Sequence, residues 1–167
     1  MEDSTVNYFS IFGLEESVDI DIDALDTSYF GLQAKYHPDS PDRLEQYSAI
    51  LNKAYSTLKD EYKRVSYMLA KKGYDLDGKS HTFNQEFLMK MMDIGEQIES
   101  LSVDNKGDIR HLYDKILKLY KQSLEQGKLH IRRGLYDEAF VEYQKMNFYR
   151  SFLEQIRNKL DQENYVI

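Results

Sequence analysis

Apolar residues recur every three or four positions along most of the chain, which is the spacing of one face of an α-helix. The helix-favouring residues Leu, Lys, Glu, Gln and Met are frequent, whereas the chain holds only two prolines and eight glycines. Both prolines lie close together, at Pro38 and Pro41, so helices on either side can run without an internal proline. The pattern predicts an all-α protein.

Two matching apolar stripes flank the prolines and predict a helical hairpin. The stripes consist of Leu25, Tyr29, Leu32 and Tyr36 before the bend, and of Leu44, Tyr47, Leu51, Ala54 and Leu58 after it. Two amphipathic helices joined by a short loop bury such stripes by folding back on each other. A short apolar segment over residues 8–14 is expected to pack across the hairpin, and a fourth helix over 61–72 is expected to end at Gly73.

A second helical unit is predicted after a break in the periodicity. Residues 75–84 are rich in Gly, Asp and Ser, which is typical of a linker. Helices are then predicted over 85–102, 109–132 and 136–162. Long helices with short connections imply an antiparallel three-helix bundle. We therefore divide the chain into a first domain over 1–74, a linker over 75–84 and a bundle over 85–167.

Composition excludes several classes of function. The chain contains no cysteine, so disulfides, thiolate catalysis and cysteine-ligated metal sites are ruled out. Its net charge of −7 disfavours binding to nucleic acid, which requires a basic face. No stretch approaches the ~20 apolar residues of a membrane span, and the N-terminus resembles neither a signal peptide nor a mitochondrial presequence. We expect a monomer without cofactor, metal, nucleic-acid or membrane partner.

Reactive side chains show no pattern that is typical of an enzyme. The four histidines, His37, His81, His111 and His130, are far apart in the sequence and have neither ligand nor triad spacing. The basic residues between Arg110 and Arg133 are interpreted as a solvated helix face. No catalytic residue is therefore predicted.

The bend itself carries the tripeptide His37-Pro38-Asp39. A proline biases the residue before it away from helical geometry, so the preceding helix is expected to end near His37. Ordinary turn chemistry explains such a sequence, because Ser40 can cap the next helix with Pro41 at its first position. The position of the tripeptide, at the tip of a predicted hairpin, is more specific than ordinary turn chemistry requires.

The tripeptide and the N-terminal segment together resemble the J domain of DnaJ-type co-chaperones. The segment that carries the resemblance consists of Tyr8, Phe9, Phe12, Gly13 and Leu14. The resemblance implies that His37, Pro38 and Asp39, with Lys35 and Tyr36, dock on a DnaK-type ATPase chaperone and trigger its ATP hydrolysis. J domains commonly carry a basic face before the tripeptide, whereas residues 1–74 hold 8 Lys+Arg against 13 Asp+Glu. This departure indicates docking that is weak or specialised for one partner.

The predicted helix over 85–102 has two apolar stripes. One can form a bundle core and consists of Phe87, Met91, Ile94, Ile98 and Leu101. The other is interleaved with carboxylates and consists of Leu88, Met89 and Met92, with Asp93, Glu96 and Glu99. A Met-rich patch with an acidic rim is typical of a partner site, because Met adapts to irregular surfaces and acids steer a basic partner. Packing of the same residues on the linker or the first domain is the alternative.

This second stripe resembles the start of the C-terminal bundle of the HscB family, the J-type co-chaperones of iron-sulfur cluster assembly. The segments Gly73-Tyr74-Asp75-Leu76 and Met146-Asn147-Phe148 extend the resemblance over nearly the whole chain. It implies that the bundle binds the scaffold protein IscU and presents it to an HscA-type chaperone. The implied scaffold contacts are Leu88, Met89, Met92, Asp93, Glu96, Glu99 and Phe148. Periodicity alone leaves open whether Phe148 is core or exposed.

The resemblance as a whole implies an L-shaped, all-α co-chaperone of the bacterial cytoplasm. Its J-domain hairpin with short flanking helices would stimulate a partner's ATPase, and its antiparallel three-helix bundle would recruit the cluster scaffold. Two alternatives are kept. The first is a J-domain adapter that delivers a different client, and the second is a purely structural helical protein.

Overall fold

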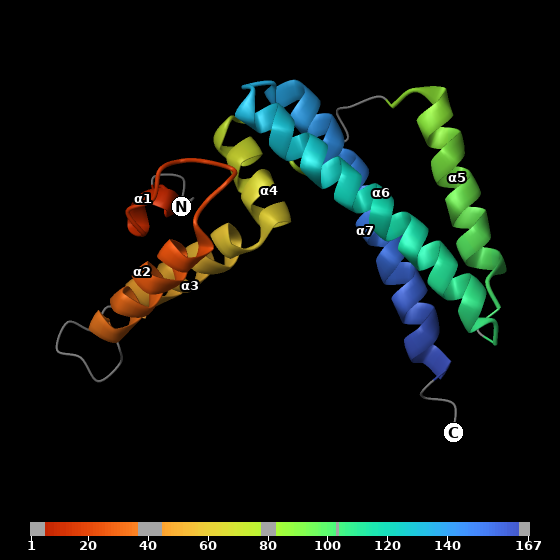
Figure 1. Ribbon diagram of the computed structural model, residues 1–167, viewed down its shortest axis with the longest axis horizontal. Helices are drawn as coiled ribbons and strands as arrows, with labels where there is room; N and C mark the ends of the chain where they lie inside the picture. The colour runs from red at the N-terminus through yellow and green to blue at the C-terminus, as the bar shows by residue number, and fades with distance from the viewer. Residues whose placement is uncertain (1–5, 37–44, 78–82, 103, 164–167) are drawn as a thin grey trace. The chain divides into compact units, whose positions relative to one another are not determined.

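The computed structural model describes residues 6–36, 45–77, 83–102 and 104–163. Over these residues it contains seven helices and no strand, which confirms the predicted all-α class (Figure 1). The chain divides into two compact units, Met1–Gly73 and Tyr74–Ile167. None of the helices in the described part of the chain is both long and apolar enough to cross a membrane.

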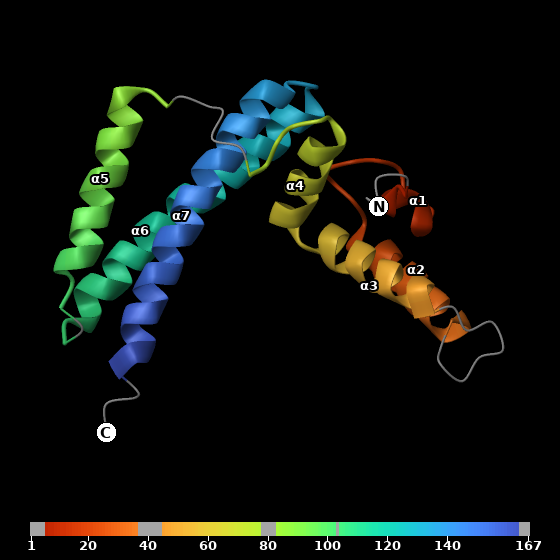
Figure 2. The ribbon, with the colours of Figure 1, turned by 180° about the vertical axis from the view of Figure 1, so that it is seen from behind.

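The first unit is built on an antiparallel pair of helices, as the two apolar stripes predict. Its helices are α1 (Tyr8–Ile11), α2 (Ile22–Lys35), α3 (Glu45–Lys59) and α4 (Glu61–Lys71). Figures 1 and 2 both show α2 and α3 lying side by side, with α4 following at one end of α3. The core of this unit consists of Tyr8, Phe9, Phe12, Val18, Leu25, Leu51, Ala54, Leu58, Val65, Met68 and Leu69.

Short polar residues set the helix ends in this unit. The side chain of Asp21 accepts a hydrogen bond from the Ala24 amide at 3.0 Å, so it caps the N-terminus of α2. Asp60 caps α4 in the same way. Gly73 follows α4 with a φ of 89°, a left-handed conformation that glycine adopts without strain, and this confirms the predicted end of the helix.

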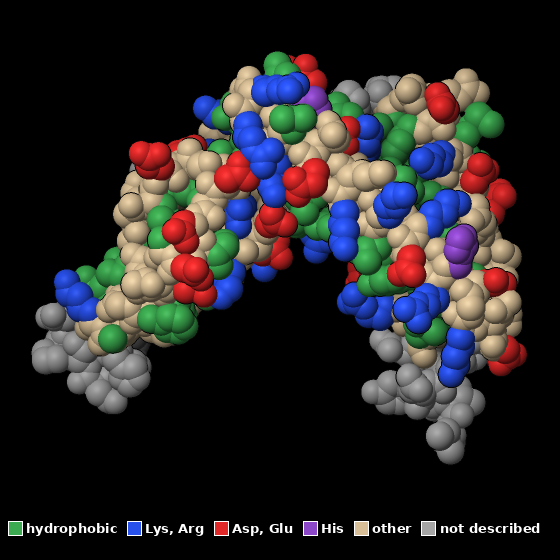
Figure 3. Space-filling model, viewed as in Figure 1, with side chains coloured by type: hydrophobic (Ala, Val, Ile, Leu, Met, Phe, Trp, Pro, Cys, Tyr) green, Lys and Arg blue, Asp and Glu red, His purple; other side chains and the backbone are tan. Residues whose placement is uncertain are grey.

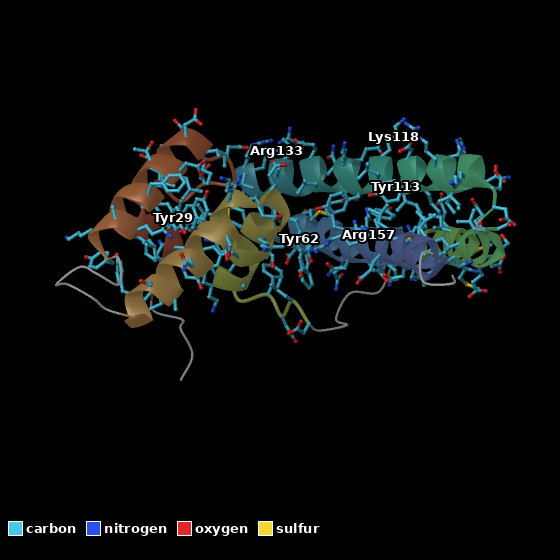
Figure 4. All side chains as sticks on the ribbon, turned by 90° about the horizontal axis from the view of Figure 1, so that it is seen from below. Tyr29, Tyr62, Tyr113, Lys118, Arg133 and Arg157 are labelled. Atoms are coloured by element: carbon cyan, nitrogen blue, oxygen red, sulfur yellow. The ribbon has the colours of Figure 1, made fainter. Side chains whose placement is uncertain are left out.

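The seam between α2 and α3 combines stacked rings with a polar network. The Tyr29 and Tyr55 rings stack with centroids 3.8 Å apart, and Figure 4 shows Tyr29 between the two helices. The Tyr55 hydroxyl donates to Asp26 at 2.9 Å, and the ammonium of Lys59 donates to the same carboxylate at 3.1 Å. These hydrogen bonds lower the pKa of Asp26, the one to Lys59 most strongly. These contacts hold one face of α2 against α3.

A buried arginine connects three segments of the first unit. The Arg64 side chain, on α4, is 3% exposed, and it donates at 2.7 Å to the carbonyl of Leu58 and at 2.7 Å to that of Val18. Burial lowers the pKa of this guanidinium. Arg64 therefore donates a hydrogen bond to one carbonyl at the end of α3 and to one in the loop before α2. Because these carbonyls are buried, water cannot replace this donor.

The second unit contains α5 (Gln85–Ser100), α6 (Lys106–Arg132) and α7 (Tyr136–Glu163). In both ribbon views α6 and α7 run side by side along most of their length, with α5 as the third helix (Figures 1 and 2). Gly134 makes the tight turn between them with a φ of 72°, as predicted. Helix α6 begins earlier than the predicted residue 109, because the Asn105 side chain caps it by accepting from the Asp108 amide at 3.2 Å.

The core of the bundle confirms the first apolar stripe of α5. Its buried members are Met91, Ile94, Ile98, Ile109, Leu112, Ile116, Tyr149, Leu153 and Ile156, with Phe87 and Leu101 packed against them. In α7 Ala139, Met146 and Leu153 are buried, whereas Leu135, just before the helix, and Leu160 are 39% and 38% exposed. Both residues lie near the ends of the helix, where the side chains of the bundle core do not cover them.

We predict that Arg64→Met destabilises the first unit by about 2–3 kcal/mol, because two buried carbonyls lose a charged donor while the volume is nearly kept. Urea unfolding of the full chain, with hydrogen exchange to locate the loss, measures the effect. Lys63→Met is the matched control, since Lys63 is exposed on the same helix, and should shift stability by less than about 0.5 kcal/mol. Equal stability of the two variants would contradict the role given to Arg64.

The pKa of Tyr74 predicts how the stability of the second unit depends on pH. Tyr74 donates to Asp137 at 2.5 Å, and this hydrogen bond raises the pKa of Tyr74 from 10.0 to about 12. A raised folded-state pKa gives stability that is complete below pH 10 and is lost as the pH rises toward 12. The stability advantage of the wild type over Tyr74→Phe should therefore shrink across that window. A difference that stays constant with pH, measured by urea unfolding, would refute this account.

Candidate functional site

The second apolar stripe of α5 lies on the surface of the bundle. Leu88, Met89 and Met92 are 42%, 57% and 65% exposed, which makes Met92 the most exposed large hydrophobic residue in the described part of the chain. Burial of such side chains is favourable, so a contiguous apolar patch that stays in water marks a partner site. The exposure favours this interpretation over packing within the bundle.

Three carboxylates lie on the same exposed side of α5. Asp93, Glu96 and Glu99 are all exposed, and within the described residues none of their carboxylates takes part in an ion pair or a hydrogen bond. Figure 3 shows acidic side chains along the outer edge of α5. Carboxylates without a partner in the chain can attract a basic surface and orient it before the apolar side chains make contact.

An aromatic cluster joins α7 to the beginning of α5. Phe148 is 37% exposed, and its ring meets the edges of Phe87 and Phe83 with centroids 5.7 and 5.6 Å apart. Phe148 is therefore neither core nor fully exposed; it lies next to the segment that carries Leu88. Phe83 falls in the predicted linker and was not among the predicted site residues, although its four-residue spacing to Phe87 is a helical signal.

The opposite face of α5 holds the patch in place. Met91, Ile94 and Ile98 are each at most 5% exposed in the bundle core. At the C-terminal end the ammonium of Lys159 donates to the carbonyls of Ile98 and Glu99 at 2.6 and 2.9 Å. A cation at this position satisfies end carbonyls and complements the helix dipole. The acidic end of α5 is thus fixed to α7.

The implied chaperone site lies at the end of α2, and the structure describes only its first residues. Lys35 is exposed, with its ammonium 5.3 Å from the centroid of the Tyr36 ring. Tyr36 is half-buried, and its ring packs on Tyr47 of α3 with centroids 4.3 Å apart. Helix α2 ends at Lys35, as expected for a chain about to reach a proline. His37, Pro38 and Asp39 lie outside the described residues.

Other surface features involve none of the predicted site residues. A groove of about 360 Å³ between α6 and α7 is lined in part by Arg150 and Arg157. Figure 4 shows Tyr113 and Arg157 between these two helices, whereas Lys118 points away from α7. In the described ranges no group of three or more acidic or histidine side chains could hold a metal ion.

Known proteins with similar sequences show the family to which this chain belongs. Residues 83–157 match the family model described as the HSCB C-terminal oligomerisation domain. The co-chaperone protein HscB homolog of Neisseria meningitidis is 34% identical over 172 residues, which cover 92% of this chain and 96% of that protein. The chain belongs to the HscB family. The homolog of Vibrio campbellii is 31% identical and covers 93% of this chain and 95% of its own length.

Solved structures of HscB proteins share the fold of this family member. Chaperone HscB from Vibrio cholerae matches with a TM-score of 0.77 and 28% identity, over 94% of this chain and 99% of that one. Human co-chaperone HscB matches with a TM-score of 0.83 over 95% of this chain and 84% of that one; its 23% identity supports the fold alone. Membership of the HscB family makes the protein a co-chaperone.

Proposed function

We propose that this HscB protein stimulates ATP hydrolysis by an HscA/DnaK-type chaperone and delivers an IscU-type scaffold to it during iron-sulfur protein maturation. The observation that carries the proposal is the exposed patch of α5, in which Leu88, Met89 and Met92 stand beside carboxylates that have no partner among the described residues. A co-chaperone of this family needs a surface for its client, and in this patch three large apolar side chains of one helix are exposed together.

In the proposed scaffold contact, the charged and the apolar side chains have different roles. Asp93, Glu96 and Glu99 attract a basic surface of the scaffold, which raises the rate of encounter. The apolar side chains then supply the affinity, because each large side chain that leaves water contributes roughly 1.5–3 kcal/mol at most. Phe148 adds a ring at the edge of the patch, where it is already oriented by Phe87.

The proposed chaperone contact is the tripeptide His37-Pro38-Asp39, with Lys35 and Tyr36 on the helix before it. A loop that presents one imidazole and one carboxylate is suited to rearranging a polar network in a partner that has two states. The chain itself performs no catalysis in this proposal. Its effect is to shift the chaperone toward the state that hydrolyses ATP.

The alternative function is a J-domain adapter that delivers a different client to a DnaK-type chaperone. It keeps the same first unit and assigns the α5 patch to another protein. Action as a monomer in the bacterial cytoplasm is also part of the proposal. Because the matched family model is described as an oligomerisation domain, the mass of the free protein must be measured at the concentrations used below.

We predict that the wild type accelerates steady-state ATP hydrolysis by an HscA- or DnaK-type chaperone, and that His37→Gln and Asp39→Asn abolish the effect. Both variants nearly keep the size of the side chain, so the fold should be unchanged, which circular dichroism can check. Synergy between this protein and IscU would support delivery of the scaffold. Equal stimulation by wild type and both variants would contradict the role of the tripeptide.

A second prediction tests the α5 patch directly. Leu88→Ala combined with Met92→Ala should weaken binding to purified IscU by at least about tenfold, because central apolar contacts dominate such interfaces. Leu135→Ala is the matched control, since Leu135 is 39% exposed but lies at the turn before α7. Calorimetry measures both. Binding that survives in the double variant would contradict the assignment of the α5 patch, and absence of binding by the wild type would favour the adapter function.

A further inference from the structure

The methionines of the chain fall into two groups that differ in exposure. The sequence has six methionines and no cysteine, so the thioether of methionine is its only sulfur group. Five of the six lie in the described residues. Met68, Met91 and Met146 are at most 5% exposed, whereas Met89 and Met92 are 57% and 65% exposed. Both exposed methionines belong to the α5 patch.

Helix α5 contains members of both groups, so access to solvent differs where the chemistry is the same. Met91 lies between Met89 and Met92 in the sequence, but its side chain is part of the bundle core. A dissolved oxidant reaches an exposed sulfur directly, whereas the sulfur of Met91 becomes accessible only when α5 opens. Hydrogen peroxide is uncharged at neutral pH, so the neighbouring carboxylates of Asp93 and Glu96 do not repel it.

We propose that Met89 and Met92 are oxidation sites through which a peroxide controls client binding at the α5 patch. The inference rests on the proposed function of this patch. In the reaction, a sulfur lone pair attacks one oxygen of hydrogen peroxide, the O–O bond breaks as the S–O bond forms, and water leaves. The sulfur loses two electrons and the peroxide gains them, so the thioether becomes a sulfoxide.

The sulfoxide changes the α5 patch at its two most exposed side chains. Its oxygen is a polar acceptor, which water satisfies in the free protein but which costs free energy when a client buries it without a donor. The ionised carboxylates beside it only accept hydrogen bonds, so the patch itself supplies no donor from them. Oxidation therefore weakens the complex while the bundle core stays intact. Methionine sulfoxide reductases convert the sulfoxide back to the thioether, which makes the control reversible.

The first part of the experiment maps the oxidation. Full-length protein is treated with hydrogen peroxide, catalase removes the excess, and tryptic peptides are analysed by mass spectrometry. Trypsin cleaves after Lys90, so Met89 is separated from Met91 and Met92, which fragmentation then distinguishes. Met89 and Met92 should each oxidise at least about tenfold faster than Met91, because only Met91 depends on opening of the helix. Equal rates at the three residues would overturn the inference.

The second part measures binding of the treated protein to purified IscU that has not met peroxide. Oxidation should weaken binding at least about tenfold, and treatment with the reductases should restore it. Met89→Leu combined with Met92→Leu is the matched variant, because leucine has a similar volume and cannot form a sulfoxide. Whatever the affinity of this variant, the same peroxide treatment should change it by less than about twofold. An equal loss of binding in the variant would overturn the inference.

ATPase assays separate the inference from the function on which it rests. Peroxide-treated wild type should still stimulate the chaperone in the absence of IscU, because the tripeptide holds no methionine and Met68 of the first unit is buried. It should lose only the synergy with IscU. Unweakened IscU binding by the fully oxidised wild type would overturn the inference and leave the proposed function intact.

Two further outcomes would also count against the inference. Unfolding of the oxidised protein, detected by circular dichroism, would overturn it, because loss of the fold would then explain the loss of binding. Failure of the untreated wild type to bind IscU would overturn both the inference and the proposed function of the α5 patch.

Discussion

The burial of one side of α5 in the bundle is the contact on which the candidate site depends. Ile94 and Ile98 are almost fully buried, and they fix the rotation of the helix about its own axis. With that rotation set, residues one or two positions from the core residues Phe87 and Met91 point away from the core, and in α5 those residues include Leu88, Met89 and Met92. The same core that stabilises the bundle thus exposes the patch, so the patch cannot be withdrawn without unpacking α5.

The same constraint acts on α2 in the first unit. There the seam with α3 fixes the helix through Tyr29 and Tyr55, and it leaves Phe30 outside. Both helices therefore carry apolar residues on two faces, of which only one is satisfied within its unit. Soluble helices normally place polar residues on the second face. These two departures from the rule, one in each unit, leave large apolar side chains exposed to water, as at surfaces that bind a partner.

Periodicity and capping chemistry predicted most of the fold but could not locate contacts between helices. The helix ends near Gly73 and Gly134 were predictable, because glycine at these turns has a local conformational cause. The position of Phe148 against Phe83 and Phe87 was not, since it depends on how α7 packs on α5. In the candidate site the α5 residues could be found by helical-wheel geometry, whereas the α7 contribution required the structure.

Acidic and basic residues are distributed unequally among the helices of the second unit, and this distribution can orient a partner as it approaches. Helix α5 carries four acidic residues and one basic residue, whereas α6 carries seven basic and three acidic residues. Exposed ion pairs contribute little to stability, so this separation is better explained by the orientation of an approaching partner than by the fold. The exposed carboxylates of α5 can steer a basic surface toward this helix, and salt weakens such steering because it screens exposed charges.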